Sequence, residues 1–338
     1  MQAKFINALQ GCNLQAPPVW FMRQAGRHLA SYRALRDKYS FLELCHNPDF
    51  IAKVTLLPLE NYQVDAAILF SDILVILEAV GLGLHFEEKL GPIIDRPIAS
   101  VKDINELPTH IDISKLQYVA EGIKALKPRL KVPLIGFCGA PFTVASYMIE
   151  GKSSRDLKKT KRWMLEDAQS FHLLLKKIAD WSISYLKMQI VAGVDAIQIF
   201  DSWANTLAYN QFCEFSCDYI AYIIEALRST DIPTIAFCRG SSVFASQLAT
   251  IKPTCISLDW NCNITDIRKQ VPRSIALQGN LDPSILYAPQ AVIKKEVKDL
   301  LNKMAGDGGF IFNLGHGIPP DVSEEAVKTV VECIKGGS

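Results

Sequence analysis

The feature that most constrains the fold is a series of short apolar runs that recur along the whole chain and end at a Gly or a polar residue. They are rich in β-branched and aromatic residues, which is typical of strands. Most show no polar alternation before their last residues, as expected for strands buried on both faces of a parallel sheet. The predicted strands are 18–23, 66–72, 133–139, 196–202, 233–238, 255–260, 274–280 and 310–315.

Segments with helical periodicity separate these runs. One example is 161–191, where Trp163, Phe171 and Trp181 recur near multiples of three and four. Strand and helix therefore alternate, which predicts an α/β protein with a (β/α)8 TIM-type barrel over residues 1–338 as one domain. Such a barrel needs about 250 residues. We therefore expect a distorted barrel with extra loops and helices. A doubly wound open sheet is disfavoured, because no Gly-x-Gly-x-x-Gly follows the first run.

Composition removes several classes of function. The 36 Lys and Arg residues nearly balance the 35 Asp and Glu residues, so no overall positive field would hold nucleic acid or anionic lipid. The most apolar run, 66–83, contains Asp72 and Glu78, and the start of the chain does not resemble a secretion signal. We therefore expect a cytoplasmic protein without a membrane span. The nine cysteines contain no Cys-x-x-Cys pair, so neither a zinc ribbon nor a disulfide framework is predicted.

Polar residues stand where the predicted strands end, and a barrel of this type builds its active site at the C-terminal ends of its strands. Because polar groups are costly at the end of an apolar strand, this pattern favours an enzyme over a scaffold. In chain order these residues are Arg23, Ser71 with Asp72, Gly139, Asp201 with Ser202, Arg239, Asp259, Asn280 and His316.

Four arginines lie close together near the N-terminus. Arg23, Arg27, Arg33 and Arg36 have no acidic residue among them. A guanidinium makes two parallel hydrogen bonds to a carboxylate and keeps its proton, so this cluster suits a polycarboxylate. A solvated helix face is the alternative for Arg33 and Arg36, whereas Arg23 follows an apolar strand and is the better candidate.

Asp72 and His316 are the other candidates that the residues themselves suggest. Asp72 lies between two apolar stretches, where its carboxylate either pairs with an arginine or points into a pocket and stabilises positive charge on a ligand. His316 lies between two glycines after the last strand, at a predicted pocket rim. No His-x-Cys or His-x-x-x-His pair accompanies it, so we predict no metal site. Tyr147 follows the Gly-rich turn after the third strand and could equally belong to the core.

Two long motifs, MRQAGR followed by a Tyr-Arg pair and GF-x-GAPFT-x-x-x-YM-x-EG, resemble the signatures of the uroporphyrinogen decarboxylase family. Shorter pieces resemble the same family in the same order, so the likeness spans nearly the whole chain. They are FSDIL, FDSW, LDW, QGNLDP and NLGHGI.

The resemblance implies a cofactor-free enzyme of haem biosynthesis that removes the carboxyl groups of the four acetate side chains of uroporphyrinogen III. Its products would be coproporphyrinogen III and carbon dioxide, and the enzyme would be a homodimer. Asp72 would accept hydrogen bonds from the pyrrole N–H groups, and Arg23 would be the general acid or would position the substrate. The predicted catalytic residues are Asp72 and Arg23, and the predicted substrate-binding residues are Arg23, Gln24, Arg27, Arg36, Asp72, Tyr147, Ser202 and His316.

Two departures from the family pattern affect loops. Ala30-Ser31 replaces a common Pro-Glu pair, and Ala204-Asn205 replaces a common Gly pair. Neither change removes a predicted site residue. Two alternatives share this fold or ligand: a zinc-dependent corrinoid or thiol methyltransferase, which needs a His-x-Cys pair absent here, and a tetrapyrrole-binding protein without catalysis.

Overall fold

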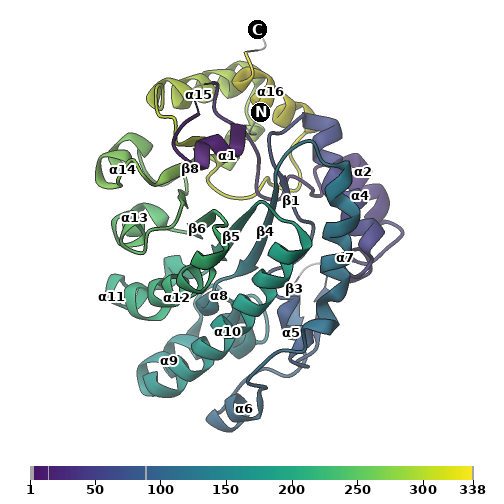
Figure 1. The fold of residues 1–338 in the computed structure, drawn as a ribbon, viewed down its shortest axis with the longest axis vertical. Coiled ribbons are helices and arrows are strands. Elements are labelled where there is room, and N and C mark those ends of the chain that lie inside the picture. Colours follow the sequence, from purple (N-terminus) through teal and green to yellow (C-terminus); the bar gives the residue numbers. More distant parts are fainter. Residues whose placement is uncertain (1–3, 14, 88–89, 337–338) are drawn as a thin grey trace.

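A curled sheet of seven strands lies at the centre of the protein, and helices surround it (Figure 1). The computed structural model describes residues 4–13, 15–87 and 90–336. Every pairing in this sheet is parallel. Its strands follow the order β1 (Ala67–Ile68), β4 (Leu134–Gly139), β5 (Ala196–Asp201), β6 (Thr234–Cys238), β7 (Cys255–Ser257), β8 (Ala276–Leu281) and β9 (Phe310–Leu314).

The segment 18–22 lies between the two edges of this sheet. Val19 forms a parallel bridge with Phe312 of β9, and its carbonyl accepts a hydrogen bond of 2.7 Å from the N–H of Asp65, just before β1. The prediction of a TIM-type barrel is therefore confirmed. The prediction of a regular first strand at 18–23 is wrong, because Pro18 has no N–H to donate and the backbone turns away at Arg23, with φ of 60°.

The helices around the sheet occupy the gaps between the strands. They are α1 (Lys4–Leu9), α2 (Ala30–Arg36), α3 (Phe41–His46), α4 (Pro48–Tyr62), α5 (Ile76–Ala79), α6 (Val101–Glu106), α7 (Gln117–Leu126), α8 (Pro141–Glu150), α9 (Lys158–Glu166), α10 (Ala168–Ala192), α11 (Tyr209–Phe212), α12 (Asp218–Leu227), α13 (Ser241–Thr250), α14 (Ile264–Gln270), α15 (Gln290–Lys303) and α16 (Glu324–Ile334).

Local sequence explains several of these boundaries. Asp167 interrupts the predicted helical segment 161–191, because its side chain accepts a hydrogen bond from the N–H of Ser170 and so begins α10 as a new helix. Pro141 occupies the first turn of α8, and Gly151 ends that helix with a φ of 78°. The long insertion after β1 also forms an antiparallel hairpin, β2 (Leu84–Glu87) with β3 (Gly91–Ile94), which is not among the predicted strands.

The barrel interior is filled at the N-terminal end of the strands. Phe5 and Leu9 of α1 pack there with Trp20 and with residues that begin the strands, such as Ile135 and Ile235. All five are almost completely buried. A ligand must therefore approach the barrel from the opposite end, where the strands terminate. Among the described residues, no helix is both long enough and apolar enough to cross a membrane.

Candidate active site

Four of the eight predicted site residues follow strands or the strand-like segment 18–22 and therefore lie at one end of the barrel. Arg23 follows the segment 18–22, Asp72 follows β1, Ser202 follows β5 directly and His316 follows β9. The C-terminal ends of parallel strands share one end of a barrel. We call this end, marked by Arg23, Asp72, Ser202 and His316, the mouth.

Asp72 holds its carboxylate at the mouth by one hydrogen bond. Its Oδ1 accepts from the N–H of Leu74 at 2.9 Å, and no described residue donates to its Oδ2. Burial raises the pKa of Asp72 to about 6, while the Leu74 hydrogen bond and the nearby charge of Arg23 act in the opposite direction. The carboxylate is therefore mostly ionised at pH 7, and one oxygen remains available to a ligand.

Arg23 has a strained backbone, and its side chain is exposed. Its φ of 60° lies in the left-handed region, which costs a residue other than Gly about 1 kcal/mol or more. Two glycines make room for it: a Cβ on Gly26 would lie 2.7 Å from the Arg23 carbonyl oxygen, and a Cβ on Gly317 would lie 2.6 Å from Arg23 Cδ. The two glycines therefore leave room for this arginine, whose charge acts on Asp72.

Gln24 lies inside the protein and holds the loop that carries Arg23. It is 1% exposed, its Oε1 accepts from the N–H of Phe21 at 3.0 Å, and its Nε2 donates to the carbonyl of Ala66 at 3.1 Å. Its side chain thereby ties this loop to the start of β1. These contacts position the backbone of Arg23, and contact of Gln24 with substrate stays a prediction.

The other arginines of the cluster differ in exposure and partners. Arg27 is exposed, and its carbonyl accepts a hydrogen bond of 2.7 Å from Arg33. Arg36 donates to the carbonyl of Tyr39 at 2.6 Å, and its guanidinium lies 6.0 Å from the ring centroid of Phe41. The structure thus engages Arg33 and Arg36 in local contacts and leaves the Arg27 side chain toward solvent.

Tyr147 on α8 joins the Asp72 neighbourhood. Burial raises the pKa of Tyr147, and the charge of Asp72 adds to this rise. Its ring packs edge-on against Trp203, with centroids 6.0 Å apart, next to the partly buried Ser202. Tyr147 therefore keeps its proton at neutral pH and can donate a hydrogen bond.

His316 is neutral in this structure. Burial is the main cause that lowers the pKa of its imidazole to about 4, and the positive charges of Arg23 and Arg239 contribute to this value. The ring stacks on Phe237, with centroids 5.8 Å apart and planes 15° apart. Its buried Nδ1 has no hydrogen-bond partner among the described residues. His316 therefore cannot act as a cationic acid at pH 7, but it can exchange a neutral hydrogen bond with a ligand.

Asp201 lies at the end of β5, and the sequence alone does not indicate a role for it. It is completely buried, and it accepts hydrogen bonds from Thr143 Oγ1 at 2.5 Å and from Ser216 Oγ. Burial raises the pKa of Asp201 to about 6 in spite of these bonds. The same Thr143 oxygen accepts from the N–H of Trp203 at 3.1 Å. Asp201 thus joins the end of β5 to α8 and supports the loop that carries Ser202.

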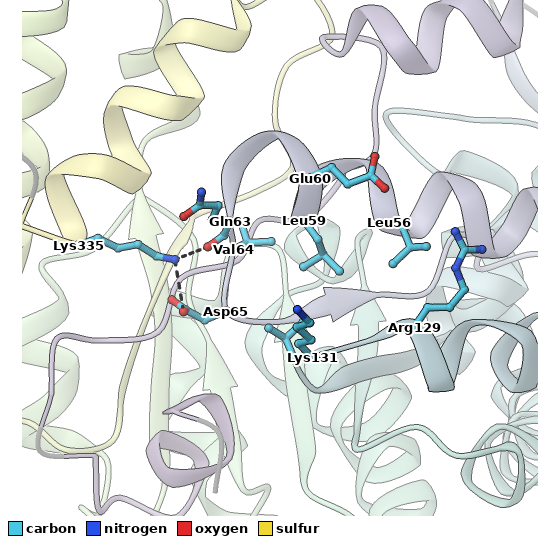
Figure 2. A pocket seen from close by; sticks show the side chains of 10 residues that line it. Leu56, Leu59, Glu60, Gln63, Val64, Asp65, Arg129, Lys131 and Lys335 are labelled. Carbon is cyan, nitrogen blue, oxygen red and sulfur yellow. Dashed lines mark hydrogen bonds and ion pairs between the residues drawn. The ribbon is translucent and has the colours of Figure 1, made fainter. Parts of the chain in front are cut away.

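The described residues contain no group of three His, Cys, Asp or Glu side chains arranged to hold a metal ion. A cleft of about 540 Å³ lies elsewhere on the surface, beside Gln63, Asp65 and Lys335 (Figure 2). Asp65 precedes β1 and Lys131 precedes β4, so this cleft lies at the N-terminal end of the strands. It is therefore separate from the mouth.

A model of the family described as uroporphyrinogen decarboxylase matches residues 1–337. A protein named uroporphyrinogen decarboxylase from Protochlamydia amoebophila is 65% identical over 332 residues, which cover 98% of this chain and 91% of that protein. A protein of the same name from Vesicomyosocius okutanii is 42% identical over 99% of this chain and 98% of its own length.

Among solved structures, a methyltransferase from Methanosarcina mazei superimposes with a TM-score of 0.83 over 99% of both chains. The two sequences are 21% identical, so this similarity shows a shared fold.

Proposed function

Since the chain belongs to the uroporphyrinogen decarboxylase family, it is a carboxy-lyase, and we propose that the mouth of its barrel is where the reaction takes place. The substrate is uroporphyrinogen III, and the four acetate side chains lose their carboxyl groups to give coproporphyrinogen III and carbon dioxide. The observation that carries the assignment of the site is the mostly ionised Asp72 carboxylate beside the Arg23 guanidinium.

We assign Asp72 to the centre of the macrocycle. The substrate first takes up a proton at a pyrrole carbon, which makes that ring a cation and an electron sink. The bond from the acetate methylene to its carboxylate then breaks, carbon dioxide leaves, and the electron pair moves into the ring. A proton adds to the methylene to give a methyl group, and the pyrrole carbon loses its proton. Asp72 accepts hydrogen bonds from the pyrrole N–H groups and stabilises the cation in a partly dry site.

We assign Arg23 to holding the reacting acetate. A guanidinium keeps its proton at neutral pH, and its planar shape matches a carboxylate. The side chain makes no hydrogen bond or ion pair with another described residue, so it is free for this contact. Arg27, Arg36, Gln24, Tyr147, Ser202 and His316 are proposed to contact the substrate farther from the reacting carbon. Of these, Tyr147 and the neutral His316 have the best support, because each lies close to Asp72 or Arg23.

The test is to incubate chelator-treated protein with uroporphyrinogen III without oxygen, then oxidise the mixture and count the carboxyl groups of the products by chromatography. Loss of four carboxyl groups without added metal is expected. Binding without loss would favour a tetrapyrrole-binding protein instead. Activity that depends on added zinc would favour the methyltransferase-like alternative, which requires ligands that the described residues do not bring together.

We further propose that the protein is a cytoplasmic homodimer, as the family resemblance implies. Two apolar side chains are consistent with a covered surface: Val243 is 69% exposed and Tyr209 is 49% exposed, on the neighbouring helices α13 and α11. Sedimentation equilibrium over a dilution series tests the dimer, and a single monomer mass at every concentration would contradict it.

A further inference from the structure

His316 reaches across the mouth from one wall of the barrel to the other. It follows β9, which neighbours the segment 18–22. Its ring nevertheless stacks on Phe237 of β6. Counted around the barrel with segment 18–22 in first place, β6 is fifth of eight positions and so lies opposite that segment. The imidazole therefore has Arg23 on one side and the end of β6 on the other.

Arg239 is the residue that stands at this end of β6. Two hydrogen bonds fix its backbone: the N–H of Arg239 donates to the carbonyl of Asp201 at 3.1 Å, and the N–H of Gly240 donates to Asp259 Oδ2 at 2.9 Å. Gly240 has a φ of 77°, which only Gly adopts without cost. Two completely buried aspartates thus hold the turn that presents Arg239.

The Arg239 side chain has no anionic partner within the described part of the chain, although it is partly buried. Its charge acts on His316, as the charge of Arg23 does from the opposite wall. Arg239 follows β6, whereas Arg23 follows the segment 18–22, so the two arginines stand at opposite walls of the mouth.

We propose that Arg239 is a further substrate-binding residue, which binds a carboxylate on the rim of the tetrapyrrole at the wall opposite Arg23. This inference rests on the proposed function. An octacarboxylate carries its charges all around the ring, so cations on one wall alone leave the far carboxylates without partners. A guanidinium on each wall, with Asp72 at the centre, fixes the macrocycle at three points.

The experiment compares Arg239→Gln, Arg239→Lys and the control Arg129→Gln. Arg129 is an exposed arginine of the cleft in Figure 2, at the other end of the barrel, so its loss removes the same charge away from the mouth. We expect Arg239→Gln to weaken equilibrium binding of uroporphyrinogen III and raise KM about tenfold or more, with kcat changed less than about threefold. Arg239→Lys should recover part of the binding, and Arg129→Gln should resemble the unmodified protein.

A histidine titration by NMR provides a readout that does not depend on turnover. The chain has six histidines, and the His316 signal is assigned by its loss in His316→Asn. Removal of the Arg239 charge should raise the pKa of His316, and Arg129→Gln should leave it unchanged. Because binding is measured at equilibrium, a protein that binds but fails to decarboxylate would refute the proposed function, and the binding of Arg239→Gln would still test this inference. If Arg239→Gln binds uroporphyrinogen III with an affinity and a KM within twofold of the unmodified protein, the proposal that Arg239 binds a substrate carboxylate is overturned.

Discussion

Asp72→Asn separates the electrostatic role of Asp72 from its structural role. Asparagine has nearly the volume of aspartate, and its side-chain oxygen can keep the 2.9 Å hydrogen bond from the N–H of Leu74. The substitution therefore removes the negative charge and little else. Its effects on stability and on turnover should have opposite signs.

The stability effect follows from the pKa of Asp72. Burial raises it from 3.8 to about 6, so the folded protein holds this proton more tightly than the unfolded chain does. As pH rises from about 4 to 6, the free energy of unfolding falls, and above pH 6 the decrease no longer grows. This difference in pKa corresponds to a decrease of about 3 kcal/mol in the free energy of unfolding. Because the Asp72 side chain is partly exposed to solvent, we expect a decrease of about 2 kcal/mol. Asp72→Asn should therefore be more stable at pH 8 by about 2 kcal/mol and equally stable near pH 3.

The catalytic effect should be a large loss. Removal of one preorganised group that faces developing charge typically lowers kcat by about 10²- to 10³-fold. Urea unfolding at pH 8 and near pH 3 measures the stability change, and carboxyl counting of the oxidised products measures turnover. Turnover within threefold of the unmodified protein would refute the assignment of Asp72. A lower stability of Asp72→Asn than of the unmodified protein at pH 8 would refute the claim that the ionised Asp72 carboxylate destabilises the folded state.

Three further predictions test other parts of the site. Ser216→Ala removes one of the two hydroxyl donors to the buried Asp201. The free energy of unfolding measured in urea should fall by about 1–3 kcal/mol, and the change in KM, converted to a free energy, should be smaller. Gly317→Ala places a Cβ against Arg23 Cδ, so we expect a raised KM with little change in the urea midpoint. His316 is neutral when folded and titrates near 6.5 when unfolded, so the protein should lose stability as pH falls from 6.5 to 4, and His316→Asn should reduce that slope by about 1.4 kcal/mol per pH unit.

The strands could be predicted because each is a local apolar run with few polar interruptions. The observed limits of β4, β5, β6 and β9 each differ from the predicted ones by one residue at one end and agree at the other. The short β1 and the bridge at Val19 could not be predicted, since the run at 66–72 gives no sign that only Ala67 and Ile68 meet a partner. Whether an apolar run pairs along its whole length depends on the twist of the closing barrel, which is not a local property.

The sequence predicts which residues gather at the site better than it predicts what each of them does. Arg23, Asp72 and His316 follow strands, so the fold rule alone brings them to one end of the barrel. The role of Gln24 could not be read locally, because its partner Ala66 is distant in sequence. The neutral state of His316 could not be predicted from the sequence either, because it arises from burial and from two arginines on other segments. The left-handed φ of Arg23 has no sequence signal of its own beyond the nearby Gly26 and the distant Gly317.

Asp72 and Asp201 show why a raised pKa does not by itself identify a catalytic carboxylate. Burial raises the pKa of both to about 6, so both are mostly ionised at neutral pH. Asp201 accepts hydrogen bonds from Thr143 and Ser216, which satisfy its two oxygens and lock three segments together. Asp72 has a single backbone donor and one oxygen without a described partner. That oxygen is therefore available to a ligand with several N–H donors, which is the chemistry that a ring of four pyrroles supplies.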